Sequence, residues 1–121
     1  DRNKIFTIHS RKAVGKVLEI LGDNYRFKAI LHWFTGSKRE LSEAVAKGCY
    51  FSINSAMVKS NRFLEMLPLI PSNRLLLETD GPFINYDGDH SDALKKSIEV
   101  LKRYVPSVDP WNNFMRLLDE N

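Results

Sequence analysis

The sequence predicts an α/β fold in which four strand-helix units follow one another and form a parallel sheet. Strand-like runs alternate along the chain with segments of helical periodicity. The strand runs are continuous hydrophobic stretches, as in parallel sheets that helices cover on both faces. Residues that can bind a metal stand at the ends of three of these runs. A chain of 121 residues that is 43% hydrophobic can bury the hydrophobic core of one domain.

The first half of the chain predicts two strands and two helices. Residues 4–9 are rich in β-forming side chains and predict a buried strand. Residues 11–21 carry apolar side chains at helical spacing, and Gly22 stands where a helix commonly ends. Residues 27–32 predict the second strand. The sequence Ser37-Lys-Arg-Glu40 is typical of a capping box, so the second helix is expected to begin there.

The third and fourth units follow the same order. Gly48 is expected to end the second helix, and residues 49–53 predict the third strand. Residues 61–67 predict a short helix that Pro68 ends. Residues 74–78 predict the fourth strand.

The last part of the chain predicts two helices. A polar loop over residues 81–90 leads into a helix over residues 91–104. Asp109 and Pro110 are the residue types preferred at an N-cap and at the first helical position. Four side chains are expected to form the apolar face of the final helix: Trp111, Phe114, Leu117 and Leu118.

Four such units leave two architectures open. A closed eight-stranded barrel needs roughly 250 residues, so this chain would supply about half of one. An open doubly wound sheet is the alternative, although no glycine-rich phosphate fingerprint follows the first strand to support a nucleotide-binding version. No linker-like stretch divides the chain, so residues 1–121 are expected to belong to a single domain.

Composition limits the surroundings and the partners. The net charge of +3 is compatible with a phosphate-bearing substrate. No apolar run reaches the roughly 18 residues of a membrane span, so no membrane partner is expected. Cys49 is the single cysteine and lies in an apolar run, which predicts a buried thiol and fits a reducing, cytoplasmic setting.

Two histidines occupy equivalent positions at the ends of the first two strands. His9 ends one run and His32 ends the next. A lone histidine there is more often satisfied by its neighbours, but two at equivalent places in successive units are not expected by chance. Adjacent parallel strands lie roughly 5 Å apart, so the two rings could share one ion. Because active sites of parallel barrels lie where strands end, the pair indicates metal-assisted hydrolysis.

Two carboxylates stand at the end of the fourth predicted strand and just after it. Glu78 comes directly after three leucines, where an unpaired charge would be costly. Asp80 lies two positions further and would point to the same side. The alternative for Asp80 is a turn residue before Gly81-Pro82, a common arrangement. Beside His9 and His32, a ligand is the favoured interpretation.

Further residues are candidates for substrate contact. Thr35 and Gly36 precede the capped helix, whose N-terminus attracts phosphate, but an ordinary loop with a good cap is the favoured interpretation of that segment alone. Trp33 could stack on a base, although packing is the commoner role. Three cationic residues are candidate phosphate contacts: Arg11, Lys59 and Arg62.

Four segments in order resemble the TatD family of metal-dependent deoxyribonucleases, within the wider amidohydrolase-like barrels. They are Ile8-His9-Ser-Arg11-Lys-Ala13, Leu31-His32-Trp-Phe-Thr-Gly36-Ser37, Tyr50-Phe-Ser-Ile-Asn54 and Leu75-Leu-Leu-Glu-Thr-Asp80-Gly-Pro82. Their order, spacing and flanking residues all agree with the family, which makes the resemblance specific.

The resemblance implies a TIM-type (β/α)8 barrel that holds two divalent ions. His9 and His32 would bind one ion, and Asp80 would bind the other and help to activate the attacking water. Glu78 would be a supporting acidic residue of the catalytic site. The implied activity is cleavage of DNA, often from the 3′ end of single strands, with Mg²⁺ as the usual cofactor. Nitrogen ligands would also suit Mn²⁺ or Zn²⁺.

The chain departs from the family pattern in its first half. The family begins with a His-x-His pair and carries a metal-bridging glutamate on its fourth strand, and neither occurs here. We therefore expect strands five to eight of the barrel, with the N-terminal half supplied by further chain or by a separate subunit. Two alternatives remain open: a related barrel that acts on a small ester, amide or phosphate, and a non-catalytic half-barrel that needs a partner.

Overall fold

The computed structural model describes residues 4–23, 25, 27–78 and 90–119, and its centre is one parallel sheet of four strands. The strands pair in sequence order and are β1 (Ile5–His9), β2 (Lys28–His32), β3 (Tyr50–Ile53) and β4 (Leu75–Leu77). All three pairings are parallel, so the carboxyl ends of the strands share one edge of the sheet. This arrangement confirms the predicted α/β class.

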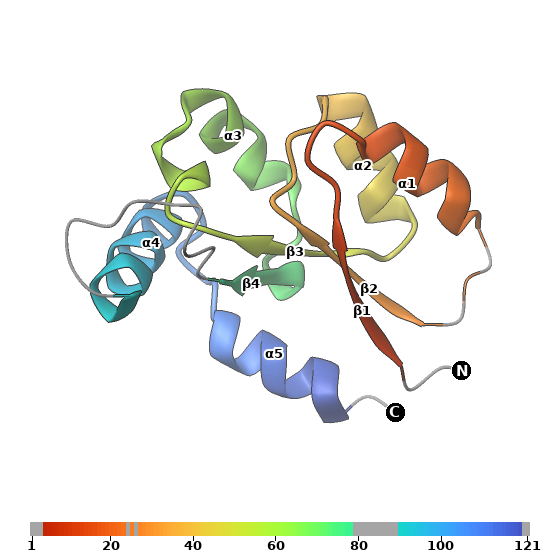
Figure 1. Cartoon of the computed structure of the whole chain (residues 1–121). Helices are drawn as coiled ribbons and strands as arrows, with labels where there is room; N and C mark the ends of the chain where they lie inside the picture. Colours follow the sequence, from red (N-terminus) through yellow and green to blue (C-terminus); the bar gives the residue numbers. More distant parts are fainter. Residues whose placement is uncertain (1–3, 24, 26, 79–89, 120–121) are drawn as a thin grey trace.

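Helices lie on both sides of the sheet (Figure 1). They are α1 (Val14–Leu21), α2 (Lys38–Ala46), α3 (Asn61–Met66), α4 (His90–Tyr104) and α5 (Pro110–Asp119). Short 3₁₀ turns, η1 (Met57–Lys59), η2 (Leu67–Leu69) and η3 (Ser72–Arg74), lie between β3 and β4. In Figure 1 helices α1 to α3 lie above the sheet and α5 lies below it. Within the described residues, no helix is long and apolar enough to cross a membrane.

Alternate residues of each strand enter two separate apolar clusters. Leu31 and Phe51 belong to the large cluster that packs against α1, α2 and α3. Their neighbours Ile30 and Tyr50 point to the other face, where Leu117 of α5 covers them. Helix α5 therefore covers the second face of the sheet. The strand residues that it covers precede the polar residues at the strand ends.

The sequence signals for the starts and ends of helices are confirmed. Gly22 follows α1 with φ 66°, and Gly48 follows α2 with φ 78°, both in the left-handed region that glycine adopts without steric cost. The capping box is complete, since the Ser37 hydroxyl accepts from the Glu40 amide and the Glu40 carboxylate accepts from the Ser37 amide. Asp109 caps α5 by accepting from the amide of Asn112.

Strand β1 is not buried, and the prediction of a buried first strand was wrong. Phe6, Thr7 and His9 are exposed, and Ile5 and Ile8 are only half-buried. The strand is paired with β2 alone in the described part of the chain, so one edge and most of both faces have no cover. A continuous hydrophobic run indicates that a strand needs two covered faces, but it does not show which element supplies them.

Several boundaries differ from those predicted. Helix α1 begins at Val14 and not at residue 11, because Lys12 has φ 60° and cannot continue a right-handed helix. Strand β4 ends at Leu77, so Glu78 lies just beyond it. His90 was predicted as loop and is the first residue of α4. The rest of the predicted loop, residues 81–89, lies outside the described residues.

Candidate active site

The two predicted histidines lie side by side at the carboxyl edge of the sheet. Parallel pairing places His9 opposite His32 in the register of β1 and β2. Their ring centroids are 4.3 Å apart, with the rings at 69° to each other. His32 is buried, whereas His9 on the edge strand is exposed. Two neighbouring imidazoles of this kind can bind one ion, each through a ring nitrogen.

Glu78 joins this pair from the other side of His32. Its Oε2 contacts His32 Nδ1, and both side chains are only 11% exposed. The Glu78 amide donates to the carbonyl of Ile53 at 3.0 Å, which continues the ladder between β3 and β4. A proton on Nδ1 that faces Glu78 puts the imidazole lone pair on Nε2, the tautomer that binds metals.

Two polar residues that sequence reasoning missed hold Glu78 in place. The Ser52 hydroxyl donates to Glu78 Oε2 at 3.0 Å and lies 3.5 Å from His32 Nδ1. The Asn54 amide donates to Glu78 Oε1 at 3.5 Å, while its carbonyl oxygen accepts from the Met57 amide at 2.9 Å. The available signal was the spacing of Ser52 and Asn54, two positions apart on an otherwise apolar strand, which sends both to one face.

The side chains at this edge of the sheet are of types that bind metals. Two imidazoles and one carboxylate are ligand types that divalent ions accept, so the donor chemistry fits. Among the described residues, however, no three histidine, cysteine or carboxylate side chains converge as a complete ligand group. Asp80, the predicted ligand of a second ion, lies outside the described residues.

Three of the candidate substrate contacts lie on the loops that follow β1 and β2: Arg11, Thr35 and Gly36. The guanidinium of Arg11 lies 4.5 Å over the ring of Trp33. The Thr35 hydroxyl accepts from the Lys12 amide at 3.0 Å and thereby ties the loop after β2 to the loop after β1. The Gly36 carbonyl accepts from Arg62 at 3.4 Å. Each residue thus has a structural contact of its own beside the predicted role.

Gly36 also has a packing role. A Cβ atom at this position would lie 2.7 Å from Phe34 Cζ and 3.2 Å from Glu40 Cβ. The capping box already occupies the amides of Ser37 and Glu40. Of the other cationic candidates, Lys59 and Arg62 are exposed on η1 and α3.

The whole-chain comparison decides the family. Residues 1–108 match the family described as TatD-related DNase. This chain belongs to the TatD-related DNase family. The match includes β1 to β4, and therefore the strand ends that carry His9, His32 and Glu78.

Curated relatives are similar over most of the chain but are much longer. The TATDN1 homologue of Encephalitozoon cuniculi is 37% identical over 106 residues, which cover 78% of this chain and 38% of the relative. The "3'-5' ssDNA/RNA exonuclease TatD" of Cronobacter turicensis is 41% identical over 83 residues, which cover 64% of this chain and 31% of the relative. The chain thus spans about a third of these TatD-family relatives.

Two similar solved structures are also much longer than this chain. A TatD-family hydrolase from Entamoeba histolytica superposes with a TM-score of 0.73 at 13% identity, covering 97% of this chain and 49% of that chain. An uncharacterized amidohydrolase from Saccharomyces cerevisiae superposes with a TM-score of 0.58 at 19% identity, covering 89% of this chain and 37% of that chain. The four βα units and this likeness confirm the predicted fold class, part of a TIM-type barrel.

Proposed function

We propose that this chain is the C-terminal half of a metal-dependent hydrolase that cleaves phosphodiester bonds of single-stranded DNA. The observation that carries the proposal is the cluster of His9, His32 and Glu78 at the carboxyl edge of the sheet in a TatD-family chain. The name of the Cronobacter relative, an exonuclease of single-stranded DNA and RNA, supports this substrate class.

The proposed site holds two divalent ions. His9 and His32 bind one, and Asp80 binds the other. Mg²⁺ is the proposed metal, and the nitrogen donors also suit Mn²⁺ or Zn²⁺. A divalent ion in such a site stabilises negative charge on phosphate oxygens and activates water as a nucleophile.

Neighbouring side chains orient the proposed ligand His32 through a chain of hydrogen bonds. Ser52 and Asn54 fix the carboxylate of Glu78 by hydrogen bonds. Glu78 in turn orients the ring of His32 and selects the tautomer with the lone pair on Nε2. Arg11, Thr35 and Gly36, on the neighbouring loops, are proposed to contact the phosphates of the substrate.

We further propose that an N-terminal half completes the barrel, either as further chain or as a separate subunit. The chain spans 31–49% of the TatD-family relatives and solved structure named above, which supports a missing half. The exposed strand β1 offers an unpaired edge to that half. The remaining metal ligands would come from there. On this account residues 1–121 are inactive alone.

We place the protein in the cytoplasm. The support is Cys49, the single cysteine of the sequence, whose side chain is fully buried. Burial raises the pKa of the Cys49 thiol, so the residue behaves as packing and not as a redox centre.

An assay of the full-length protein tests the proposed function. Labelled single-stranded DNA is incubated with Mg²⁺, with Mn²⁺ or with a chelator, beside a panel of small esters, amides and phosphomonoesters. Cleavage of DNA that requires the metal is expected. Turnover of a small substrate with intact DNA would favour the related-barrel alternative, and no turnover of either would favour a non-catalytic role.

A further inference from the structure

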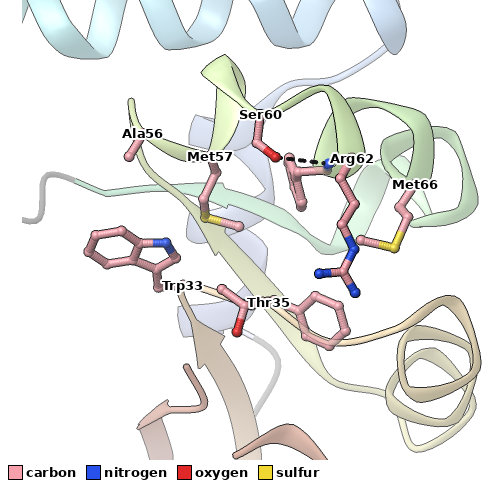
Figure 2. A pocket seen from close by; sticks show the side chains of 9 residues that line it. Trp33, Thr35, Ala56, Met57, Ser60, Arg62 and Met66 are labelled. Carbon is pink, nitrogen blue, oxygen red and sulfur yellow. Dashed lines mark hydrogen bonds between the residues drawn. The ribbon is translucent and has the colours of Figure 1, made fainter. Parts of the chain in front are cut away.

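A hollow of about 210 Å³ opens among the segments that follow β2 and β3 (Figure 2). Its walls come from the loop after β2, the segment after β3 and helix α3. Trp33 and Thr35 line one side, and Met57 and Arg62 line the other. Trp33 directly follows His32, the last residue of β2, in the chain.

The size and lining of this hollow limit what it can hold. Pockets for drug-sized molecules measure about 300–1,000 Å³, so this one is suited to a smaller flat group. The lining is mainly aromatic and aliphatic, with the Trp33 ring and Met57 among the apolar residues. The polar residues of the lining are Thr35, Ser60 and Arg62. A planar heterocycle with polar edges fits such a lining.

The backbone at Trp33 gives independent support for a functional role. Trp33 has φ 55°, in the left-handed region that bulky side chains rarely adopt. Strained positions of this kind persist where the surrounding structure holds them, and they gather at ligand sites. The turn sends Phe34 into the core, where it is 2% exposed, while Trp33 stays half-buried beside the hollow.

Two cations flank the aromatic ring. The Arg11 guanidinium lies 4.5 Å over the indole of Trp33, and Arg62 lines the hollow while it donates to the Gly36 carbonyl. Both side chains are exposed to solvent. An aromatic platform with cations beside it is the combination that binds single-stranded nucleic acid, because the ring stacks on a base while the cations meet the phosphates.

We propose that the Trp33 hollow binds one nucleobase of a single-stranded substrate, next to the bond that is cleaved. Trp33 supplies the stacking surface, and Arg11 and Arg62 contact the flanking phosphates. The inference rests on the proposed nuclease function and adds to it a base subsite that is tolerant of sequence, since every base has a stacking face.

The test measures binding by the full-length protein in the presence of a chelator, so that no cleavage occurs. A labelled short oligothymidylate is compared with an abasic oligomer of equal length, which has the same phosphates but no bases. Trp33→Phe keeps an aromatic ring. Trp33→Asn removes it but tolerates the left-handed backbone, so the variant keeps the loop conformation. Thermal melting of each variant confirms folding.

Stacking on Trp33 predicts that wild-type protein and Trp33→Phe prefer the oligothymidylate. Loss of one stacked base corresponds to roughly 5- to 150-fold weaker binding, and Trp33→Asn is expected to lose that preference. Equal binding of both oligomers by the wild type, or an unchanged preference in Trp33→Asn, would overturn the base subsite and leave the nuclease proposal standing. Failure of the wild type to bind either oligomer would also overturn the base subsite, whereas the nuclease proposal is tested separately by metal-dependent cleavage.

Fluorescence gives a second readout of the same contact. The sequence contains two tryptophans, Trp33 and the exposed Trp111. In a Trp111→Phe background, the emission of Trp33 is obtained as the difference from a Trp33→Phe/Trp111→Phe double variant. The oligothymidylate is expected to quench it and the abasic oligomer is not. Unchanged emission on binding of the oligothymidylate would show that the base lies elsewhere.

Discussion

At the scale of single residues, the carboxylate of Glu78 connects the candidate ligand His32 to the rest of the sheet. Ser52 and Asn54 donate to its two oxygens, and His32 Nδ1 pairs with one of them. Residues that orient a ligand in this way commonly set metal affinity even though they do not touch the metal. Within this network, Ser52, Asn54 and Glu78 are therefore placed to position the candidate ligand His32.

Removal of the Ser52 hydroxyl is expected to weaken metal binding more than folding. In Ser52→Ala, Glu78 loses one hydrogen bond and His32 becomes less well oriented. The free energy of unfolding should fall by about 1 kcal/mol, and metal affinity by roughly 10- to 100-fold. Calorimetric titration with Mn²⁺ and thermal melting of the full-length protein measure the two effects. Ser42→Ala on the exposed face of α2 is the control, and equal metal affinity in both variants would contradict the role given to Ser52.

Gly36 is expected to be intolerant of any side chain for reasons of space. In Gly36→Ala the new Cβ would lie 2.7 Å from Phe34 Cζ, and the Phe34 ring is buried in the core. Overpacking of this kind costs about 1–3 kcal/mol of the free energy of unfolding. Gly48→Ala meets only an ordinary contact, 3.8 Å from Arg74 Nη1, but has φ 78°, so its expected cost is about 1 kcal/mol. Urea unfolding compares the two, and a smaller loss in Gly36→Ala than in Gly48→Ala would contradict the packing account.

Sequence reasoning at this scale found the histidines and Glu78 but not Ser52 or Asn54. Histidine at a strand end is conspicuous because its chemistry is uncommon in a core. Serine and asparagine in a strand are ordinary, and their role appears only when the register shows which carboxylate they face. The side-chain oxygen of Asn54 accepts from the Met57 amide, and this contact likewise depends on the path of the chain after β3.

At the scale of elements, Tyr25 ties the loop before β2 to the end of α2. Its hydroxyl donates to the Lys47 carbonyl at 2.5 Å and lies 3.6 Å from Cys49 Sγ. Lys47 completes the contact by donating to Gly22 O and Asp23 Oδ1, and this partner lowers the pKa of Asp23. The two loops on this side of α1 and α2 are therefore linked by side chains.

This link is expected to make stability sensitive to alkaline pH. Burial raises the pKa of Tyr25 above its ordinary value of 10.0. The unfolded state then loses the phenolic proton first as the pH rises, so the Tyr25 contribution is complete below pH 10 and is lost above it. Tyr25→Phe should lower stability by about 0.5–1.5 kcal/mol at neutral pH and should flatten the decline at alkaline pH. Urea unfolding at several pH values measures this, and parallel curves for the two proteins would contradict it.

Helix α5 presents an apolar stripe that the described residues do not cover. Trp111, Phe114, Met115 and Leu118 recur at helical spacing and are all exposed, while the buried residues of α5 are Pro110, Asn113 and Leu117. The sequence predicted an apolar helix correctly, but it could not show that most of this face has no neighbour here. The same holds for β1, whose hydrophobic run lacks a second layer.

If the N-terminal half covers this stripe, Trp111 is buried in the full-length protein. Trp111→Ala should then cost about 3–5 kcal/mol of the free energy of unfolding. Ile20→Ala on α1 is the matched control, because Ile20 is 75% exposed and Trp111 is 72% exposed in this chain. The control is expected to change stability by less than about 0.5 kcal/mol. Similar small effects of both substitutions in denaturant unfolding would show that the stripe stays exposed.

At the scale of the whole molecule, the chain has the organisation of half a barrel. The sheet has helices α1 to α3 on one side, α5 beneath the other and an uncovered edge at β1 (Figure 1). The number of units and their parallel order could be predicted, because hydrophobic runs and helix-ending glycines are local signals. Closure of the barrel could not, since it depends on strands that this sequence does not show.

The central claim is that His32 belongs to a metal-dependent nuclease site. The most direct measurement is the cleavage rate of labelled single-stranded DNA by the full-length protein, wild type against His32→Gln, with Mg²⁺ and with a chelator. Glutamine keeps an amide donor near Glu78 but lacks the imidazole nitrogen. The account predicts that both the chelator and the substitution reduce cleavage by at least roughly 100-fold while the melting temperature changes little. Cleavage that continues at the wild-type rate in His32→Gln, or that is indifferent to the chelator, would contradict it.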